Sequence, residues 1–347
     1  MKRILVTGGT GFIGSHTCLS LLEKDYELWV IDSLVNSSSL SLDRVKKLTN
    51  KGNNILFFKG DLRNRNFLSE VFAKANESGK PLNAVVHFAG LKAVSESISE
   101  PLNYWDVNVI GTLNLLHVMK ENNCNTIVFS SSATIYGISN YLPIQESNII
   151  RSINPYGTTK IVIEKLLNDL FQSSPSKFRI CSLRYFNPIG AHPSGLIGEC
   201  PIGTPTNIFP LIMQAAKGRI KQLKIYGRDW DTPDGTAIRD YIHVMDLAEG
   251  HLLALEYLLS NEPQIINLNL GTKKGTSVLE LVHTFEKINN IKVPYKFYSR
   301  REGDYCTVIA DNKKASSIIG WSPQRSLEEM CIDGWRWQCS NPEGYLK

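Results

Sequence analysis

Residues 3–14 read RILVTGGTGFIG, a short β-branched run that leads directly into a glycine-rich turn. We expect a buried strand over Ile4 to Val6 and a helix from Gly14 onward. The glycines after the strand have the spacing G-x-x-G-x-x-G, at Gly8, Gly11 and Gly14. Because glycine has no Cβ, such a loop lets the backbone approach a pyrophosphate at the positive end of the helix dipole. The segment therefore predicts a nucleotide-binding turn, one residue longer than the usual G-x-G-x-x-G.

An acidic residue, Asp32, closes the second predicted strand, Leu28–Ile31, and lies 18 residues after Gly14. At this place Asp32 can accept hydrogen bonds from both hydroxyls of an adenosine ribose, and its charge repels a ribose 2′-phosphate. No lysine or arginine between residues 33 and 43 offsets that charge. The pattern favours NAD over NADP, although a turn needed only for packing, with Asp32 as a strand-end cap, would have the same residues. Asp61, after the third predicted strand, is either an adenine contact or an ordinary turn residue.

Short apolar runs alternate with amphipathic stretches through the first half of the chain. This alternation is typical of a parallel sheet with helices on both faces, and right-handed crossovers then give a doubly wound α/β fold of the Rossmann type. The predicted strands are Ile4–Val6, Leu28–Ile31, Ile55–Phe58, Ala84–Phe88, Thr126–Phe129 and Ile180–Leu183. The predicted helices are Gly14–Lys24, Asn66–Ala75, Asn108–Asn122 and Tyr156–Phe171.

The composition of the sequence changes at Pro188, where prolines and glycines become frequent. We therefore expect a dinucleotide-binding domain over residues 1–187 and a smaller α/β substrate domain over residues 188–347, with the segment around 239–270 returning to the first domain. A length of 347 residues suits two such units. The helices predicted in the second half are Ile208–Lys217, Val244–Leu259, Ser277–Asn289 and Ser326–Gln338.

The composition excludes several classes of protein. Hydrophobic residues make up 42% and charged residues 20%, as in globular chains rather than disordered ones. The net charge of +5 is spread without a basic cluster, so we expect no nucleic-acid or membrane partner. No apolar stretch approaches the ~20 residues of a membrane span, and no secretion signal precedes the first strand, which predicts a cytoplasmic protein. The seven cysteines lack zinc or disulfide spacing, so we expect reduced thiols and no metal.

A candidate catalytic group comes from two neighbouring segments. Tyr156 and Lys160 open a predicted helix four residues apart and therefore share one face. A phenol is a weak base at neutral pH, but a nearby ammonium and a positive nicotinamide ring favour phenolate, which makes Tyr156 a candidate general base. Ser132 follows the fifth predicted strand at the carboxyl edge of the sheet, where α/β folds bind ligands, and can share the proton of a substrate hydroxyl. The structural alternative is an exposed tyrosine and lysine beside a serine turn.

Several further motifs keep a fixed order along the chain. Besides the glycine loop and Tyr156–Lys160, they are Phe88–Val94, Ser130–Thr134 with Tyr136-Gly137, Arg184–Asn187, Arg239–Val244 and Arg301–Asp304. Together these motifs resemble those of the UDP-glucose 4-epimerase family, whose members are extended short-chain dehydrogenase/reductases. The resemblance runs over essentially the whole chain, as far as Trp335-Arg336-Trp337.

The resemblance implies one retained NAD and the interconversion of UDP-glucose and UDP-galactose. Tyr156 would take the proton of the 4-hydroxyl while hydride passes to NAD, and the 4-keto sugar would turn over in the site and recover hydride on its other face. It also implies a homodimer through helices Asn103–Asn122 and Tyr156–Phe171.

The resemblance also carries over two sets of binding residues. Those implied for NAD are Gly8, Gly11, Phe12, Ile13, Gly14, Asp32, Asp61, Leu62, Phe88, Ala89, Gly90, Lys92, Asn108, Ser130, Tyr156, Lys160, Tyr185 and Phe186. Those implied for the UDP-sugar are Ser132, Tyr156, Asn187, Asn207, Ile208, Lys224, Tyr226, Arg239, Arg301, Asp304 and Val308. Arginine forks suit the paired phosphates of such a ligand.

One position departs from part of the family. Counted from the Arg301–Asp304 motif, the residue facing the sugar is Val308, where members restricted to unacetylated hexoses carry a tyrosine. The smaller side chain predicts room for the 2-acetamido group of UDP-N-acetylglucosamine, so an N-acetylated or dual-specificity epimerase is the alternative function. The other interpretation is that Val308 is a packing residue and Tyr305 fills the space.

Other functions on the same scaffold differ at identifiable residues. A sugar-nucleotide dehydratase would need an acid beside Ser132, and Ala133-Thr134 supply none. A UDP-glucuronate epimerase would need extra positive charge for the sugar carboxylate, which the sequence does not exclude. A non-catalytic dinucleotide sensor could dispense with Tyr156 and Lys160, and both are present.

Overall fold

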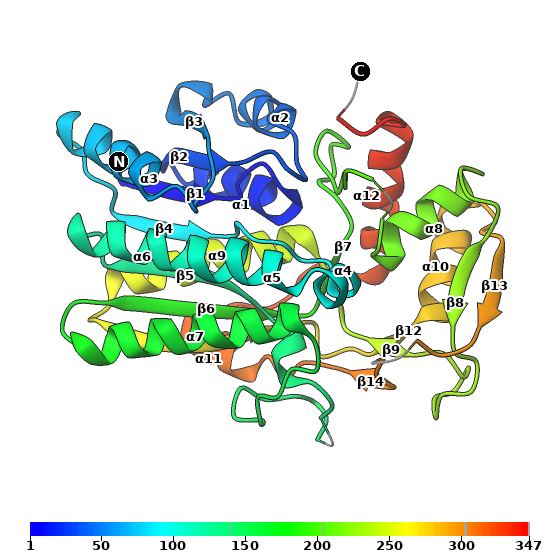
Figure 1. The fold of residues 1–347 in the computed structure, drawn as a ribbon. Helices are drawn as coiled ribbons and strands as arrows, with labels where there is room; N and C mark the ends of the chain where they lie inside the picture. The colour runs from blue at the N-terminus through cyan, green and yellow to red at the C-terminus, as the bar shows by residue number, and fades with distance from the viewer. Residues whose placement is uncertain (140, 204, 302–303, 346–347) are drawn as a thin grey trace.

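The fold is built on one parallel sheet of seven strands (Figure 1). The computed structural model describes residues 1–139, 141–203, 205–301 and 304–345. The strand order is β11-β6-β5-β4-β1-β2-β3, and every neighbouring pair is parallel. The strands are β1 (Arg3–Thr7), β2 (Glu27–Asp32), β3 (Ile55–Lys59), β4 (Ala84–His87), β5 (Thr126–Ser132), β6 (Arg179–Tyr185) and β11 (Gln264–Leu270). All six predicted strands lie in this sheet, and the doubly wound α/β prediction is confirmed.

Helices cover both faces of the sheet, which explains why the strands are apolar without alternation. Along β1, Ile4 and Val6 pack into one core and Leu5 into the other, as the two-residue period of a strand requires. The helices on the first face are α1 (Phe12–Glu23), α2 (Leu40–Thr49), α9 (Val244–Ser260) and α11 (Lys313–Ile319). Those on the second face are α3 (Arg65–Glu77), α6 (Gly111–Glu121) and α7 (Pro155–Ser173) (Figure 1).

The strand order changes direction between β1 and β4. The chain moves outward from β1 to β2 and β3, then returns to place β4, β5 and β6 on the other side of β1. In open parallel sheets, ligands bind beyond the carboxyl ends of the strands at this switch point. Here those ends lead into the glycine loop at Gly8 and into the segment that follows His87.

Two details of the first half differ from the sequence prediction. The helix predicted over Asn108–Asn122 begins as a π-helical turn, η2 (Trp105–Ile110), preceded by α4 (Val94–Ser99) and α5 (Pro101–Tyr104). Such turns are rare and are frequently found at functional sites. The sequence prediction does not include strand β11, because its sequence QIINLNL mixes polar with apolar residues, which suits an edge strand better than a central one.

A second, smaller core lies at the right of Figure 1, where β7 (Asn187–Ile189) continues from the end of β6. Its main helices are α8 (Ile208–Ala216), α10 (Val278–Asn289) and α12 (Leu327–Ser340). Capping boxes start α10 at Ser277 with Glu280 and α12 at Ser326 with Glu329. The remaining strands are β8 (Leu223–Tyr226), β9 (Ile238–Arg239), β10 (Tyr241–His243), β12 (Thr276–Ser277), β13 (Tyr295–Tyr298) and β14 (Thr307–Val308). Two 3₁₀ turns, η1 (Gly52–Asn54) and η3 (Ala133–Tyr136), belong to the first half of the chain.

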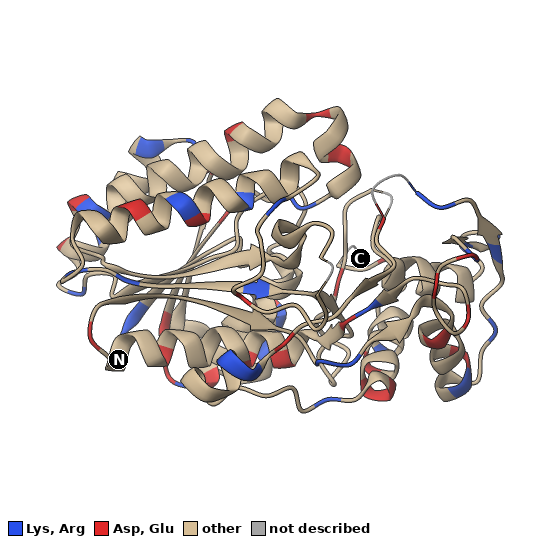
Figure 2. Cartoon of the chain, turned by 90° about the horizontal axis from the view of Figure 1, so that it is seen from below, with Lys and Arg blue, Asp and Glu red and all other residues tan. Residues whose placement is uncertain are grey.

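The surface carries charges of both signs. Figure 2 shows lysine and arginine interleaved with aspartate and glutamate along the outer helices. Among the described residues, no helix combines the length and the apolar character that crossing a bilayer requires. All seven cysteines are free thiols in the structure.

Candidate active site

The glycine loop is tightly folded, and two of its positions leave no room for a side chain. Gly8 has a φ of +70°, and a Cβ there would lie 2.6 Å from the amide nitrogen of Ala89. A Cβ on Gly14 would collide with the carbonyl oxygen of Gly8. Helix α1 then starts after Gly11 with no side-chain cap and no acidic residue in its first turn, which contains Phe12 and Ile13. Its free N–H groups and dipole are therefore available to an anion.

Asp32 lies at the end of β2, beside this loop, and is 8% exposed. Its carboxylate accepts hydrogen bonds from the Thr10 amide at 3.1 Å, the Leu34 amide at 2.9 Å and the Ser37 hydroxyl at 2.9 Å. A carboxylate offers about four acceptor positions, so two ribose hydroxyls would require one of these bonds to open. The Ser37 hydroxyl is the donor that can rotate away. The carboxylate thus holds the loop in shape and remains well placed for a ribose.

Asp61 lies in an ion pair that the sequence did not reveal. Arg63 approaches its carboxylate to 2.7 Å and also lies 2.7 Å from Asp106. The Arg63 hydrogen bonds hold the pKa of Asp61 below its ordinary value. The side chain therefore has a structural partner already, while the neighbouring Leu62 is buried. A contact of Asp61 with adenine remains a prediction.

Asn108 clamps the loop that follows β4. Its Oδ1 accepts from the Leu91 amide at 2.7 Å, and its Nδ2 donates to the Leu91 carbonyl at 3.1 Å and to Thr159 at 3.2 Å. A Cβ on Gly90 would lie 2.9 Å from the Asn108 Oδ1, so this close approach requires glycine. The π-helical turn η2 thus ties the loop of Phe88, Ala89 and Gly90 to helix α7.

The predicted catalytic residues meet at the carboxyl end of β5. Asn154 caps α7 by accepting from the Gly157 amide at 2.8 Å, which fixes the first turn where Tyr156 lies. Lys160, one turn later, donates from Nζ to the Ser130 carbonyl at 2.8 Å, and its Nζ lies 5.8 Å from the centre of the Tyr156 ring. Ser132, Tyr156 and Lys160 are all buried. The exposed-pair alternative is therefore wrong.

Burial dominates the electrostatics of this group. It raises the pKa of Tyr156 above its ordinary value, and a hydrogen bond with Ser132 acts in the opposite direction. It lowers the pKa of Lys160 to about 8, while the Glu164 carboxylate opposes that change. The sequence predicts that the ammonium and a positive nicotinamide ring together favour the phenolate; in the chain alone, the desolvation of the phenol is the larger effect. Further positive charge beside the ring is needed to make Tyr156 a base.

Behind the catalytic residues lies a buried ion pair that sequence reasoning missed. Arg184 on β6 makes two bonds to Glu164 on α7, at 3.0 Å and 2.6 Å, and both side chains are at least nine-tenths buried. The Ser131 hydroxyl donates to Glu164 at 2.5 Å. Glu164 is four residues after Lys160, and this spacing was the available clue. The pair locks α7 against the two strands that carry Ser132 and Tyr185.

Three aromatic positions predicted to contact the cofactor lie close to this group of residues. The Tyr185 hydroxyl pairs with the Ser130 hydroxyl. Phe88 packs on the buried His251 ring at 4.6 Å between ring centres. Phe186 lies in a cluster with Ile135, Tyr136 and Val308. That cluster also includes Ala133 and Ile161, the chain neighbours of Ser132 and Lys160, so Val308 does lie on the side of the catalytic group.

The cationic residues predicted to hold a diphosphate lie on or near the strands beside the second, smaller core. Val308 of β14 is the register partner of Arg239 on β9, and Arg239 approaches Asp304 to 3.9 Å. The Arg301 guanidinium lies 3.8 Å from the centre of the Tyr226 ring, and Lys224 lies on the same strand, β8. Glu302 and Gly303 of the same motif lie outside the described residues.

The polar residues predicted for the UDP-sugar lie at two junctions of this region. Asn187 begins β7 and pairs with Tyr241. Asn207 occupies the N-cap position of α8, which starts at Ile208, but its side chain makes no hydrogen bond to the first turn of the helix. Instead the Asn207 amide donates to Glu199 at 2.9 Å, and so does Lys92 from the loop after β4, also at 2.9 Å.

Comparison with known proteins agrees with this geometry. The family model described as GDP-mannose 4,6 dehydratase matches residues 5–333. A UDP-glucose 4-epimerase of Bacillus subtilis is 50% identical over 99% of this chain and 98% of its own length. The chain belongs to the UDP-glucose 4-epimerase family.

Solved structures of this epimerase family share the fold along the whole chain. The enzyme from Bifidobacterium longum, in complex with NAD+ and UDP, has a TM-score of 0.93 and 43% identity, over 99% of this chain and 100% of its own. The enzyme from Stenotrophomonas maltophila, with bound NAD and formylated UDP-arabinopyranose, has a TM-score of 0.94 and 42% identity, over 99% of both chains.

The neighbourhood of Ser132 distinguishes this epimerase from a dehydratase. The next residues are Ala133 and Thr134, and the Thr134 hydroxyl donates to Ser132 at 2.9 Å. Within the described ranges, no carboxylate hydrogen-bonds to Ser132. The acid that the elimination of water would need is therefore not beside the serine.

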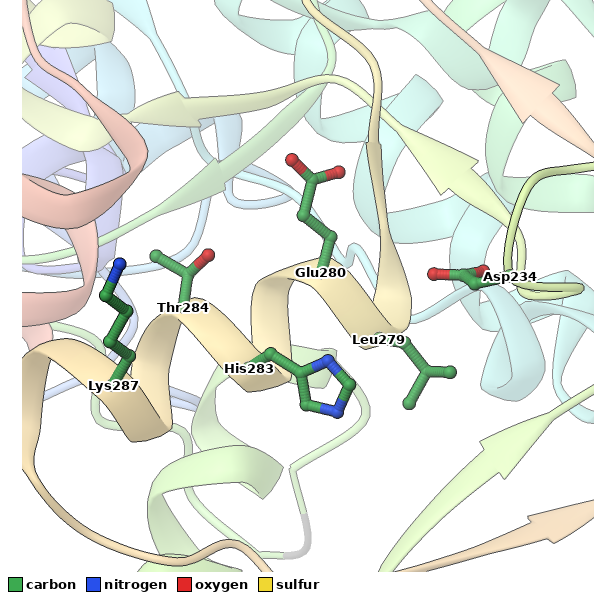
Figure 3. Close-up of a pocket in the computed structure, with 6 residues that line it drawn as sticks. All are labelled: Asp234, Leu279, Glu280, His283, Thr284 and Lys287. Atoms are coloured by element: carbon green, nitrogen blue, oxygen red, sulfur yellow. The ribbon is translucent and has the colours of Figure 1, made fainter.

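A surface hollow on α10 lies apart from this epimerase site. Figure 3 shows the six residues that line it, Asp234, Leu279, Glu280, His283, Thr284 and Lys287. Its acids are already engaged, since Glu280 belongs to the capping box and Asp234 accepts from Thr236 at 2.7 Å. In the part of the chain that the structure describes, no group of three or more His, Cys, Asp or Glu side chains is arranged to hold a metal ion.

Proposed function

We propose that the chain interconverts UDP-galactose and UDP-glucose through a transient 4-keto sugar. The observation that carries this proposal is the 50% identity with a UDP-glucose 4-epimerase over nearly both whole chains, together with the buried Ser132, Tyr156 and Lys160 at the ligand edge of the sheet. The glycine loop, which admits no side chain at Gly8 or Gly14, supports NAD as the cofactor. When bound, NAD supplies the acceptor and then the donor of hydride at C4 of the hexose.

The chain's own residues manage the proton. The buried Tyr156 phenol has a raised pKa, so it holds its proton until positive charge approaches the ring. Ser132 lies close enough to Tyr156 to oppose the rise of its pKa, and it is placed to share the proton of the substrate 4-hydroxyl. Lys160 is anchored to the Ser130 carbonyl at 2.8 Å and keeps two further N–H donors, which suit a ribose hydroxyl. Tyr156 then returns the proton when hydride comes back to the other face.

The diphosphate is the part of the substrate that this chain can hold most firmly. Arg239 and Arg301 supply guanidinium forks, and the free first turn of α8 at Ile208 suits a phosphate oxygen. Asn187, Asn207, Lys224, Tyr226 and Asp304 complete the set that we assign to the nucleotide. A firm grip on the nucleotide and a loose one on the hexose suits a ring that must turn over between the two hydride transfers.

N-acetylated UDP-sugars are the second candidate substrates. Val308 packs with Ile135, Tyr136 and Phe186 in a cluster that continues to the catalytic group, so its small size supports extra room beside the hexose. Tyr305 is the residue that could fill this room. Its hydroxyl is buried without a partner among the described residues, and burial raises its pKa, while Arg239 and Asp304 have smaller, opposed effects. The proximity of these two residues supports a position nearer the diphosphate than the hexose. A UDP-glucuronate reaction has no such support.

We infer further that residues 188–347 form the UDP-sugar domain beside a dinucleotide domain over residues 1–187, with the segment around 239–270 in the latter. The proposal also includes a homodimer in the cytoplasm. Exposed apolar side chains on α4, α5 and η2, the segments that precede α6, support the dimer, with Ile98 62%, Leu102 82% and Ile110 44% exposed. Free thiols throughout the chain fit a reducing compartment.

The substitution Tyr156→Phe tests this function. It removes one hydroxyl from the buried site, so we expect UDP-galactose turnover to fall by at least about 10²-fold, because a positioned acid–base group contributes about that much. The NAD content of the purified protein should stay equal to that of the wild type. Equal turnover by the variant and the wild type would reject the enzyme and support a dinucleotide sensor.

A further inference from the structure

Glu199 lies between the two halves of the site and belongs to none of the predicted residues. Its side chain is 6% exposed, and one oxygen, Oε1, accepts from both Lys92 Nζ and Asn207 Nδ2 at 2.9 Å. Lys92 follows β4 on the cofactor side, and Asn207 starts α8 on the substrate side. A buried carboxylate is costly unless such partners compensate it, so this placement is specific.

The backbone around Glu199 is fixed independently of its side chain. The Trp337 indole donates to the Glu199 carbonyl at 3.1 Å, and the Gly198 amide donates to the Tyr345 hydroxyl at 3.2 Å. A Cβ on Gly198 would collide with the Trp337 ring. The backbone of Glu199 is therefore held in place, with Trp337 of α12 as one support, and the carboxylate is left to bond its two partners.

The effect on Asn207 follows from hydrogen-bond chemistry. A carboxylate only accepts, so the Asn207 amide must turn its nitrogen toward Glu199 and its oxygen away. Asparagine at this helix position usually accepts from the first turn with that oxygen, but here no capping bond forms. Glu199 thus keeps the Asn207 carbonyl and the first turn of α8 available to a ligand.

The effect on Lys92 is complementary. An ammonium has three donors, and the bond to Glu199 uses one of them. The side chain is 47% exposed, so without Glu199 it would sample many rotamers. The bond holds the ammonium near the loop of Phe88, Ala89 and Gly90 with two donors free for a cofactor oxygen.

We propose that Glu199 is a positioning residue that couples the grip on NAD to the grip on the UDP moiety. The inference rests on the proposed assignment of Lys92 to NAD and Asn207 to the UDP-sugar. A bound NAD that holds Lys92 also holds the Glu199 carboxylate, which thereby orients Asn207 for UDP. By linkage, UDP must strengthen NAD binding by the same factor by which NAD strengthens UDP binding.

The test measures UDP binding to the NAD-loaded enzyme by calorimetry and, separately, the rate of NAD release with and without saturating UDP. For Glu199→Ala we expect UDP binding about tenfold weaker or more, the scale of a lost hydrogen bond to a charged group. We expect KM for UDP-galactose to rise more than kcat falls. UDP should slow NAD release in the wild type and change it less than about twofold in Glu199→Ala.

Two further variants separate positioning from a general structural effect. Glu199→Gln keeps an acceptor for Asn207 but provides no charge for Lys92. UDP affinity should therefore recover to within about threefold of the wild type, while UDP should still have no effect on NAD release. This variant also serves as the test if Glu199→Ala does not fold. Glu343→Gln, which breaks an exposed ion pair with Arg219, is the matched control and should bind UDP normally.

The double variant with Asn207→Ala decides the result. If Glu199 acts through Asn207, adding Glu199→Ala to Asn207→Ala should cost no further UDP affinity. Equal losses in both backgrounds would overturn the proposal. Normal UDP binding by Glu199→Ala beside weak binding by Asn207→Ala would overturn the coupling alone, whereas normal binding by Asn207→Ala would reject the site assignment and the coupling with it.

Discussion

Replacing Lys160 by methionine should stabilise the protein while it destroys the active site. The Lys160 ammonium is buried, and burial lowers its pKa from 10.5 to about 8. Each unit of that difference corresponds to ~1.36 kcal/mol, so holding the charge inside costs roughly 3 kcal/mol at neutral pH. Methionine fills a similar volume without that charge. We expect the free energy of unfolding to rise by about 2–3 kcal/mol at pH 7, less the lost bond to the Ser130 carbonyl.

The pH dependence gives the sharper form of this prediction. The folded pKa lies below the unfolded one, so between about pH 8 and pH 10.5 the unfolded chain binds the extra proton. The free energy of unfolding of the wild type should therefore rise between these pH values relative to that of Lys160→Met. The difference in free energy of unfolding between the two proteins should shrink toward zero by pH 10.5. Below pH 8 the difference should be constant.

The assay is urea unfolding of both proteins, freed of dinucleotide, at several pH values from 7 to 10.5. Lys165→Met on the exposed side of the same helix is the control, because its ion pair with Asp169 is exposed and worth less than about 1 kcal/mol. Turnover of UDP-galactose should be lost in Lys160→Met and retained in Lys165→Met. A stability difference between Lys160→Met and the wild type that does not change with pH would refute the reasoning.

Three further substitutions probe other parts of the site. Val308→Tyr should abolish turnover of UDP-N-acetylgalactosamine and spare UDP-galactose, as followed by NMR; an equal effect on both sugars would show that Val308 does not set the size of the pocket. Glu164→Gln removes the carboxylate that raises the pKa of Lys160, so the alkaline limb of the rate profile should move to lower pH. The same change leaves Arg184 buried without its partner and should lower the free energy of unfolding by about 3–5 kcal/mol in urea titrations; an unmoved alkaline limb would separate Glu164 from Lys160. Gly14→Ala places a Cβ against the Gly8 carbonyl and should lower the NAD content of the purified protein at least tenfold, whereas unchanged content would count against the glycine loop as the pyrophosphate site.

The central sheet and the nucleotide loop were predictable because local sequence determines them. Strands buried on both faces, such as β1 and β5, appear as continuous apolar runs, and the glycine spacing after β1 requires close backbone approach. The shared helix face of Tyr156 and Lys160 follows from helix geometry alone, since four residues make about one turn. The sequence did not indicate the edge strand β11, because three of its seven positions are polar.

The supporting residues could not be predicted because their partners are distant in the sequence. Glu164 and Arg184 meet only when α7 packs against β6, and Glu199 finds Lys92 across 107 positions of chain. The direction of the Tyr156 pKa was likewise hidden, because desolvation depends on everything that covers the ring. A pattern of residue types identifies the reacting groups, while packing decides their protonation.

Epimerisation without added cofactor tests the central claim most directly. The purified protein is incubated with UDP-galactose and no NAD, and the anomeric signals of the sugar are followed by NMR. The account predicts conversion to UDP-glucose by the wild type and none by Tyr156→Phe. No conversion by a wild-type protein that carries NAD would contradict the assignment of this site to UDP-galactose and UDP-glucose.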